Sequence, residues 1–270
     1  QMYGQNGMKA MNSNPFEKNP RNKFNRTVFV NPHLFFRQSH RWLGLFTSIQ
    51  LLMWTVSGLF FTLPDIKDVR GEQYLVKSQS QVIDPLVTSE LFSITNIIEA
   101  ANLSEEEEVS IKLKRRSGQW VYQIDRPLKE TLIFDALTGK QRSYLVESEV
   151  INIVQSETNL EPINVVLINT PLTGSEFRGR DLPLYKVSVL KPQKGIVYID
   201  PLTGEIVAVR TKLWRAWDFL WSLHIMDYRE RDDFSHGLIR VFAILGLLTV
   251  LSGMLLWYYS SKYGPSKDAG

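Results

Sequence analysis

Residues 211–259 read TKLWRAWDFLWSLHIMDYRERDDFSHGLIRVFAILGLLTVLSGMLLWYY, and this stretch decides the fold class. Its first part places five residues on one stripe of an α-helix: Trp214, Trp217, Trp221, His224 and Ile225. The three tryptophans predict an aromatic belt at a membrane surface. A charged turn follows, and Ser235 is placed to cap the next helix. Residues 241–259 carry no charge, and at about 1.5 Å per residue they nearly cross a hydrocarbon core of roughly 30 Å. The stretch therefore predicts an interfacial helix followed by a transmembrane helix.

A second apolar run lies earlier in the chain, at residues 44–63, where the sequence is GLFTSIQLLMWTVSGLFFTL. A secretory signal peptide is the alternative, but its apolar region is shorter, lies nearer the N-terminus and ends in a small-residue cleavage site. We therefore expect two transmembrane helices in a two-pass protein. Basic residues flank both runs, which predicts cytoplasmic termini and an exported middle region: Lys18, Arg21, Lys23, Arg26, Arg37, Arg41, Lys262 and Lys267.

The bulk composition hides these helices. The chain is 44% hydrophobic and 22% charged, as in a soluble protein, because a large polar middle dilutes the two apolar runs. It contains no cysteine, which excludes disulfides, iron–sulfur clusters and thiolate zinc sites, and which suits a bacterial periplasm. The sequence has no nucleophile elbow, phosphate-binding loop or zinc-protease motif. Hydrolase and nucleotide-dependent functions therefore have little support, and we expect no nucleic-acid partner.

The middle region repeats itself. Residues 132–140 read LIFDALTGK and residues 197–205 read VYIDPLTGE. Each copy predicts a strand, an Asp-x-x-Thr-Gly turn in which Asp caps the turn and Gly supplies a left-handed residue, and a second strand. A helical pattern precedes each motif, and alternating stretches lie between helix and motif: helices at 90–101 and 147–157, strands at 109–113, 120–124, 163–168 and 185–190. These copies predict an ectodomain of two helix-plus-antiparallel-sheet repeats.

The predicted fold class is therefore a membrane α+β protein in which two transmembrane helices flank a periplasmic ectodomain. We divide it into a flexible basic cytoplasmic arm (1–31), an interfacial lead-in with transmembrane helix 1 (32–63), repeat 1 (64–143), repeat 2 (144–210), the Trp-rich interfacial helix and turn (211–234), transmembrane helix 2 (235–260) and a cytoplasmic tail (261–270).

The chain resembles a known family. The paired copies resemble PepSY domains, and the flanking segments resemble the PepSY-associated transmembrane family over residues 35–260. The motifs that carry this likeness are HRWLG at 40–44, LHIMDY at 223–228, Ser-Gly at 57–58 and 252–253, and Leu-Trp at 256–257. Larger members resemble inner-membrane reductases for ferric siderophores that hold b-type haem between helix histidines. Other PepSY proteins resemble the inhibitory propeptide region of thermolysin-like peptidases.

The resemblance implies two alternative functions. The first is a haem-associated electron-transfer or accessory subunit linked to ferric-siderophore or iron reduction, whose enzymatic role would be that of a subunit of a membrane ferric reductase-type oxidoreductase. With two spans and no flavin module, the chain is expected to act as a half-unit that forms a homodimer, or within a larger membrane redox complex in the lipid bilayer. The second is a non-enzymatic module that binds a periplasmic protein and regulates a peptidase or scaffolds a membrane complex.

Candidate ligands for haem b are the histidines at the span ends, because a b-type haem needs axial imidazoles in an apolar helical environment. His40 and His236 lie at opposite faces of the membrane and cannot share an iron, whereas His224 and His236 could share an outer site. His40 would pair across a dimer or with a partner subunit. The alternative for each histidine is a bond to lipid phosphate or backbone. A charge inside a span is costly, so Arg240 is expected to snorkel, or to bind a haem propionate, a lipid phosphate or Asp227.

One loop is a candidate for contact with a partner protein. Arg178 and Arg180 lie in a Gly-containing loop at residues 173–181. This pattern is compatible with a partner contact, and equally with an ordinary surface loop.

Overall fold

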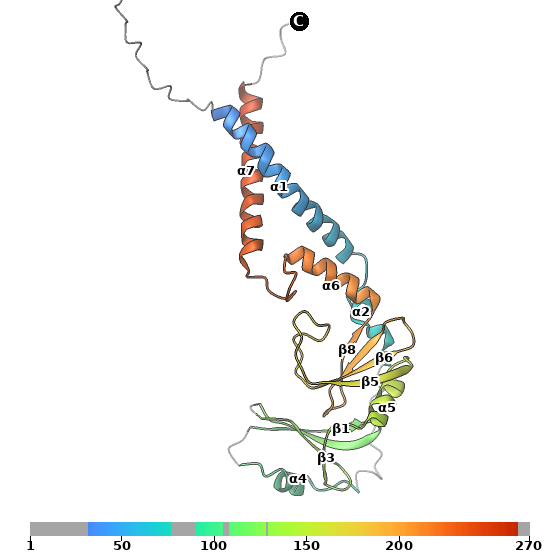
Figure 1. Ribbon diagram of the computed structural model, residues 1–270. Coiled ribbons are helices and arrows are strands. Elements are labelled where there is room, and N and C mark those ends of the chain that lie inside the picture. Colours follow the sequence, from blue (N-terminus) through green and yellow to red (C-terminus); the bar gives the residue numbers. More distant parts are fainter. Residues whose placement is uncertain (1–31, 77–89, 105–107, 128, 264–270) are drawn as a thin grey trace, which may run out of the picture.

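The computed structural model describes residues 32–76, 90–104, 108–127 and 129–263 (Figure 1). The predicted basic arm at 1–31, most of the tail at 261–270 and residues 77–89 of the predicted first repeat lie outside the described residues.

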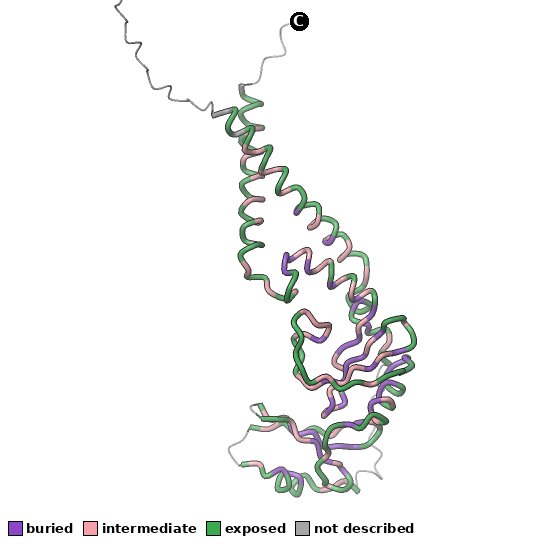
Figure 2. The backbone as a smooth tube through the Cα atoms, viewed as in Figure 1, coloured by how far each residue is buried: buried purple, intermediate pink, exposed green. Residues whose placement is uncertain are grey.

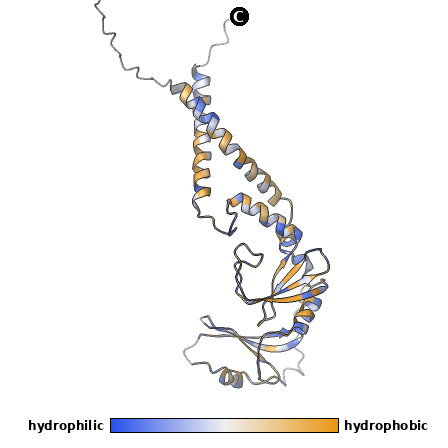
Figure 3. Ribbon diagram, viewed as in Figure 1, coloured by the Kyte–Doolittle hydropathy of each residue, from blue (hydrophilic) through white to orange (hydrophobic). Residues whose placement is uncertain are grey.

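Two long helices carry the apolar runs, α1 (Pro32–Phe61) and α7 (Gly237–Tyr263). Within them, Arg37–Phe61 and Gly237–Lys262 are long and apolar enough to cross a membrane. Figures 2 and 3 show that both helices are largely exposed along their length and hydrophobic in their middle parts. Large apolar side chains that no other part of a protein covers are typical of a surface that faces lipid. Both helices are therefore compatible with a two-pass membrane protein.

The two helices meet near the start of α1 and diverge toward the sheets (Figure 1). There α6 (Lys212–Ile225) packs beside the end of α1, where the Phe61 ring lies 5.2 Å from that of Trp217 and 5.9 Å from that of Trp221. The chain leaves α1 through two short helices that the sequence did not predict, α2 (Ile66–Arg70) and the 3₁₀ helix η1 (Glu72–Tyr74).

The prediction that Ser235 caps the second apolar helix is wrong. Its backbone N–H and its hydroxyl both donate to the Asp233 carboxylate, at 2.7 and 2.6 Å, while α7 begins at Gly237. Ser235 therefore lies two residues before the first residue of α7, and its two donated hydrogen bonds stabilise the turn there.

Both predicted sheets are present, and they have the same topology. Each is a four-stranded antiparallel sheet whose strands follow chain order. The first copy contains α4 (Ile94–Ala100), β1 (Ser110–Arg116), β2 (Gln119–Asp125), β3 (Leu132–Asp135) and β4 (Gln141–Arg142). The second contains α5 (Glu147–Glu157), β5 (Pro162–Ile168), β6 (Leu184–Val189), β7 (Ile196–Ile199) and β8 (Ile206–Arg210).

The two Asp-x-x-Thr-Gly turns have matching hydrogen bonds. Asp135 accepts from the backbone N–H groups two and three residues later, at 3.1 and 2.9 Å. Asp200 accepts the equivalent bonds at 2.8 and 2.7 Å. The closing glycines, Gly139 and Gly204, have φ of 67° and 75°, in the left-handed region. The predicted turn chemistry is therefore confirmed in both copies.

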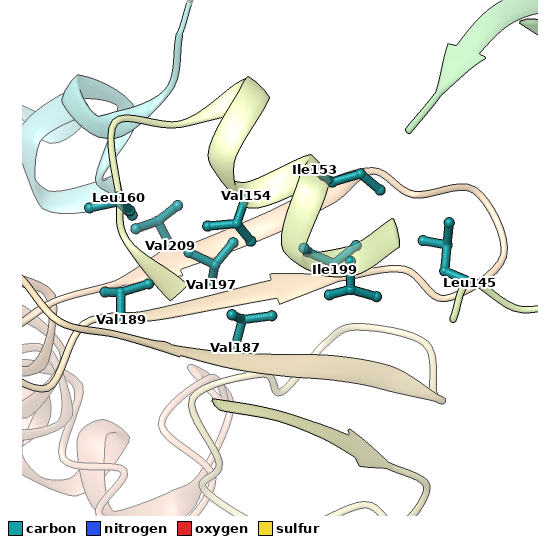
Figure 4. Close-up of a cluster of buried hydrophobic side chains, with 10 residues drawn as sticks. Leu145, Ile153, Val154, Leu160, Val187, Val189, Val197, Ile199 and Val209 are labelled. Carbon is teal, nitrogen blue, oxygen red and sulfur yellow. The ribbon is translucent and has the colours of Figure 1, made fainter. Parts of the chain in front are cut away.

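Each repeat has its own apolar core. In the second repeat, α5 lies on one face of the sheet (Figure 4). Its side chains Ile153 and Val154 are buried in one cluster with strand residues: Val187, Val197, Ile199 and Val209. The first repeat has a separate core that includes Ile97, Trp120, Tyr122, Ile124 and Phe134. The Leu145 backbone N–H donates to the Pro201 carbonyl at 2.8 Å, which ties the start of the second repeat to its own β7–β8 turn.

Candidate functional site

His40 lies on the face of α1 that packs against α7. Its Nδ1 is 2.8 Å from the hydroxyl oxygen of Ser252, and its ring lies so close to Gly253 that a Cβ there would come within 3.1 Å of Cε1. The Ser252 hydroxyl donates its one proton to the Thr249 carbonyl at 2.9 Å. With the hydroxyl proton assigned to this carbonyl, the Ser252 oxygen accepts from His40, which assigns the ring proton to Nδ1 and the lone pair to Nε2.

His224, in the last turn of α6, has the same arrangement at the other end of α1. Its Nδ1 is 2.8 Å from the Ser57 hydroxyl oxygen, and that hydroxyl donates to the Met53 carbonyl at 2.7 Å. The same assignment of the hydroxyl proton to a backbone carbonyl places the His224 ring proton on Nδ1 and the lone pair on Nε2. Its ring centroid lies 5.6 Å from that of Phe61 and 6.4 Å from those of Trp54 and Trp221. Burial lowers the pKa of His224, which favours the neutral imidazole.

His236 has a different partner and the opposite tautomer. Its Nε2 lies 2.8 Å from the Ile225 carbonyl, which can only accept, so Nε2 carries the proton. This bond satisfies one of the last carbonyls of α6, which have no partner within that helix. His236 thus ties the end of α6 to the start of α7, whereas the ring of His224 faces α1.

Asp227 organises the turn between α6 and α7. Its two carboxylate oxygens accept four backbone N–H groups at 3.0–3.1 Å, from residues 229, 230, 232 and 233. Burial acts to raise the pKa of Asp227, but the four hydrogen bonds outweigh it and lower the pKa to about 2. Arg240 is exposed and makes no hydrogen bond or ion pair within the described chain, so the expected pairing of Arg240 with Asp227 is not observed.

We expect this turn to open in acid. Because the pKa of Asp227 is depressed in the folded protein, its contribution to stability is complete above the unfolded value, about 3.9. It is lost as the pH falls through about 2. Hydrogen exchange should show that the amides of residues 229, 230, 232 and 233 lose protection between about pH 4 and pH 2. Asp227→Asn should weaken their protection at neutral pH and remove this pH step, and an unchanged step in that variant would contradict the assignment.

A polar stripe on α1 runs from His40 to Ser57, the partner of His224. It was not predicted from the sequence. Thr47, Gln50, Trp54 and Ser57 follow His40 at offsets of 7, 10, 14 and 17 residues, which places them on one face of α1. The Thr47 hydroxyl lies 3.3 Å from that of Thr249, and Trp54 Nε1 donates to the His224 carbonyl at 2.6 Å. Gln50 is only 7% exposed, and its amide nitrogen has no partner among the described residues. Heptad-like spacing of polar residues in an apolar run was the signal that could have revealed the stripe.

Ionic contacts hold α6 to the second repeat. The buried Asp218 carboxylate accepts from Arg178 and, at 2.6 Å, from Arg231. Arg215 makes a two-point contact with the Glu176 carboxylate. Arg178 of the loop at 173–181 is therefore used within the chain. The predicted aromatic belt is divided, because Trp214 is buried against the repeat while Trp217 and Trp221 contact α1.

No group of three or more His, Cys, Asp or Glu side chains that could hold a metal ion occurs in the described part of the chain. Comparisons with protein-family models, with curated proteins and with solved structures found no match to this chain. The PepSY resemblance stays a prediction from the motifs that carry it.

Proposed function

We propose that the chain is a two-pass protein of the bacterial inner membrane that belongs to the PepSY-associated transmembrane family and serves as a haem-associated electron-transfer or accessory subunit in the reduction of ferric siderophores. In this proposal both termini are cytoplasmic and the two repeats are periplasmic. The observation that carries it is the pair of imidazoles, His40 and His224, whose Nδ1–H groups are each held by a serine hydroxyl at opposite ends of α1.

His40 and His224 would each supply one of the two axial ligands of a b-type haem. An imidazole that binds a metal through one nitrogen usually donates the N–H of the other to a neighbouring acceptor, which fixes its tautomer and ring orientation. His40 and His224 both have this form with the assigned tautomers, and among the described residues neither Nε2 has a hydrogen-bond partner. Haem bound there would supply reversible one-electron transfer.

The two histidines would serve two different haems. His40 and the His224 partner Ser57 are 17 residues apart in α1, about 25 Å along a helix. Each level therefore needs a second axial ligand from outside this set. His236 would have to give up its bond to the Ile225 carbonyl to reach a ligand position through Nε2. A homodimer, in which each histidine meets its counterpart, supplies both missing ligands.

Haem content tests this proposal quantitatively. The dimer model predicts one haem per chain in the detergent-purified protein, because two chains share two haems. His40→Ala and His224→Ala should each halve that content, and the double variant should lose it. His236→Ala is the matched control and should retain full content. Pyridine haemochrome assays would contradict the proposal if both single variants kept the wild-type content.

A second candidate function rests on the edge strand β5. This strand has no charged residue and exposes the apolar side chains of Ile163, Val166 and Leu167. By contrast, the edge strand β1 carries Lys112 and Lys114, which discourage pairing with another strand. An apolar edge can accept a strand from a partner, as expected of a module that regulates a peptidase or scaffolds a membrane complex.

Substitutions can separate the two functions. Val166→Lys should abolish capture of a periplasmic partner and leave haem content unchanged, whereas His40→Ala and His224→Ala should do the reverse. Leu172→Lys, at an exposed loop position, is the control. Partner capture that survives Val166→Lys would argue against the β5 edge as the binding surface.

A further inference from the structure

A cavity lined by three arginines lies where the second repeat meets the short helices that follow α1. The three arginines come from separate elements: the exposed Arg70 at the end of α2, the exposed Arg180 in the β5–β6 loop and the partly buried Arg210 at the end of β8. The buried ring of Trp214 also lines it, and its volume is about 280 Å³. Figure 1 shows α2 and β8 at the end of the second repeat that lies nearest α6 and α1.

The carboxylates around this cavity do not balance its positive charge. Glu176 is committed to Arg215, and Asp218 to Arg178 and Arg231. Among the residues that line the cavity, Glu72 is the single carboxylate, and it is exposed. Within the described chain, the side chains of Arg70 and Arg180 make no hydrogen bond or ion pair. Three guanidinium groups against one carboxylate leave a net charge of +2 on the lining.

Arg210 is held in position before any ligand arrives. Its Nε donates to the Glu176 carbonyl at 2.9 Å, its Nη1 to its neighbour's carbonyl at 3.4 Å, and its guanidinium lies 4.3 Å from the centre of the Trp214 ring. Burial, followed by the positive charge of Arg180, lowers the pKa of Arg210 to about 10. Arg210 is therefore still charged at neutral pH, and it lies beside a like charge that an anion would neutralise.

We propose that this cavity binds the phosphate group of a small ligand. A planar guanidinium group binds two phosphate oxygens at once, and three arginines from separate elements suit a group with several charged oxygens. The volume is slightly below the roughly 300 Å³ of the smallest typical ligand sites, which leaves room for a phosphate and a short carrier such as glycerol. A free glycerol phosphate and the headgroup of an anionic phospholipid share this chemistry. The proposal is independent of haem.

The test uses the full chain in an uncharged detergent. Calorimetric titration with inorganic phosphate and with glycerol 3-phosphate probes the soluble source. Native mass spectrometry of the chain in nanodiscs of phosphatidylglycerol or of phosphatidylcholine probes the lipid source. The variant Arg70→Gln/Arg180→Gln removes two guanidinium groups that hold no structural bond among the described residues. Arg229→Gln is the control, because Arg229 is exposed and lies outside the cavity lining.

Phosphate binding should weaken about tenfold for each guanidinium group removed, since a hydrogen bond to a charged group contributes at least about that factor. Arg229→Gln should bind as the wild type does. Binding of glycerol 3-phosphate identifies a soluble ligand, and retention of phosphatidylglycerol over phosphatidylcholine identifies a lipid; either outcome supports the site if the double variant loses it. The proposal is overturned if neither probe binds, if chloride at equal ionic strength competes as well as phosphate, or if the double variant binds normally.

Discussion

Replacing Asp218 by alanine is expected to lower the free energy of unfolding by about 3–5 kcal/mol, the cost of removing one partner of a buried ion pair. Asp218 is 2% exposed, and both of its oxygens accept from arginines, Arg178 and Arg231. Its loss leaves the partly buried Arg231 without its carboxylate partner and leaves Arg178 only the exposed Asp232. Among the described residues, it also removes one of the two ionic contacts between α6 and the β5–β6 loop, the other being that of Arg215 with Glu176. Denaturant unfolding of the full chain in detergent, followed by tryptophan fluorescence, measures the change.

Asp232→Ala is the matched control for this prediction. The Asp232 carboxylate contacts the same Arg178, at 3.0 Å, but its side chain is 61% exposed. Solvent screens such a pair, so its removal should cost about 0–1 kcal/mol. Equal losses in the two variants would show that burial of Asp218 does not set the strength of this contact.

Gly139→Ala is expected to destabilise the first repeat by about 2–5 kcal/mol. The backbone at Gly139 has φ of 67°, where a residue with a Cβ is strained by about 1–2 kcal/mol. A Cβ there would also lie 2.5 Å from the ring of Phe92, so the ring must move, which adds about 1–3 kcal/mol. Thermal unfolding of the full chain, with the first repeat followed by hydrogen exchange, measures the effect.

Gly118→Ala isolates the backbone part of this effect in the same repeat. Gly118 has φ of 83°, but a Cβ there would meet nothing within 4 Å. This variant should therefore show only the strain of about 1–2 kcal/mol. If Gly118→Ala proves as costly as Gly139→Ala, the contact with Phe92 contributes nothing.

Local sequence signals predicted the framework of the chain. The uncharged runs led to α1 and α7, and the repeated Asp-x-x-Thr-Gly motif led to both antiparallel sheets, because hydrophobic length and turn chemistry are properties of short segments. The helix at 212–228 was also predicted, although it ends at Ile225 because Met226 takes a left-handed conformation with φ of 57°.

Contacts between distant segments were not predictable in the same way. The three tryptophans of α6 were assigned to one belt from their spacing, yet Trp214 packs beneath Arg210 and Trp217 contacts Phe61. Their surroundings depend on where the β5–β6 loop and the end of α1 come to lie.

The candidate histidines were found from the sequence, but their chemistry was not. His40, His224 and His236 are equivalent by residue type and position near helix ends. The proton positions follow from their partners, a serine hydroxyl for the first two and a backbone carbonyl for the third. The serines lie 212 and 167 residues away in the chain, so no local pattern could distinguish the two tautomers.

The absorption spectrum of the full chain, purified in detergent after expression with ample haem, tests the central claim most directly. The spectrum is recorded oxidised and then reduced with dithionite. If His40 and His224 bind haem, the wild type shows the sharp reduced α-band of b-type haem, and the His40→Ala/His224→Ala double variant lacks it. A featureless visible spectrum of the wild type, or an α-band that persists in the double variant, would contradict the assignment of His40 and His224 as haem ligands.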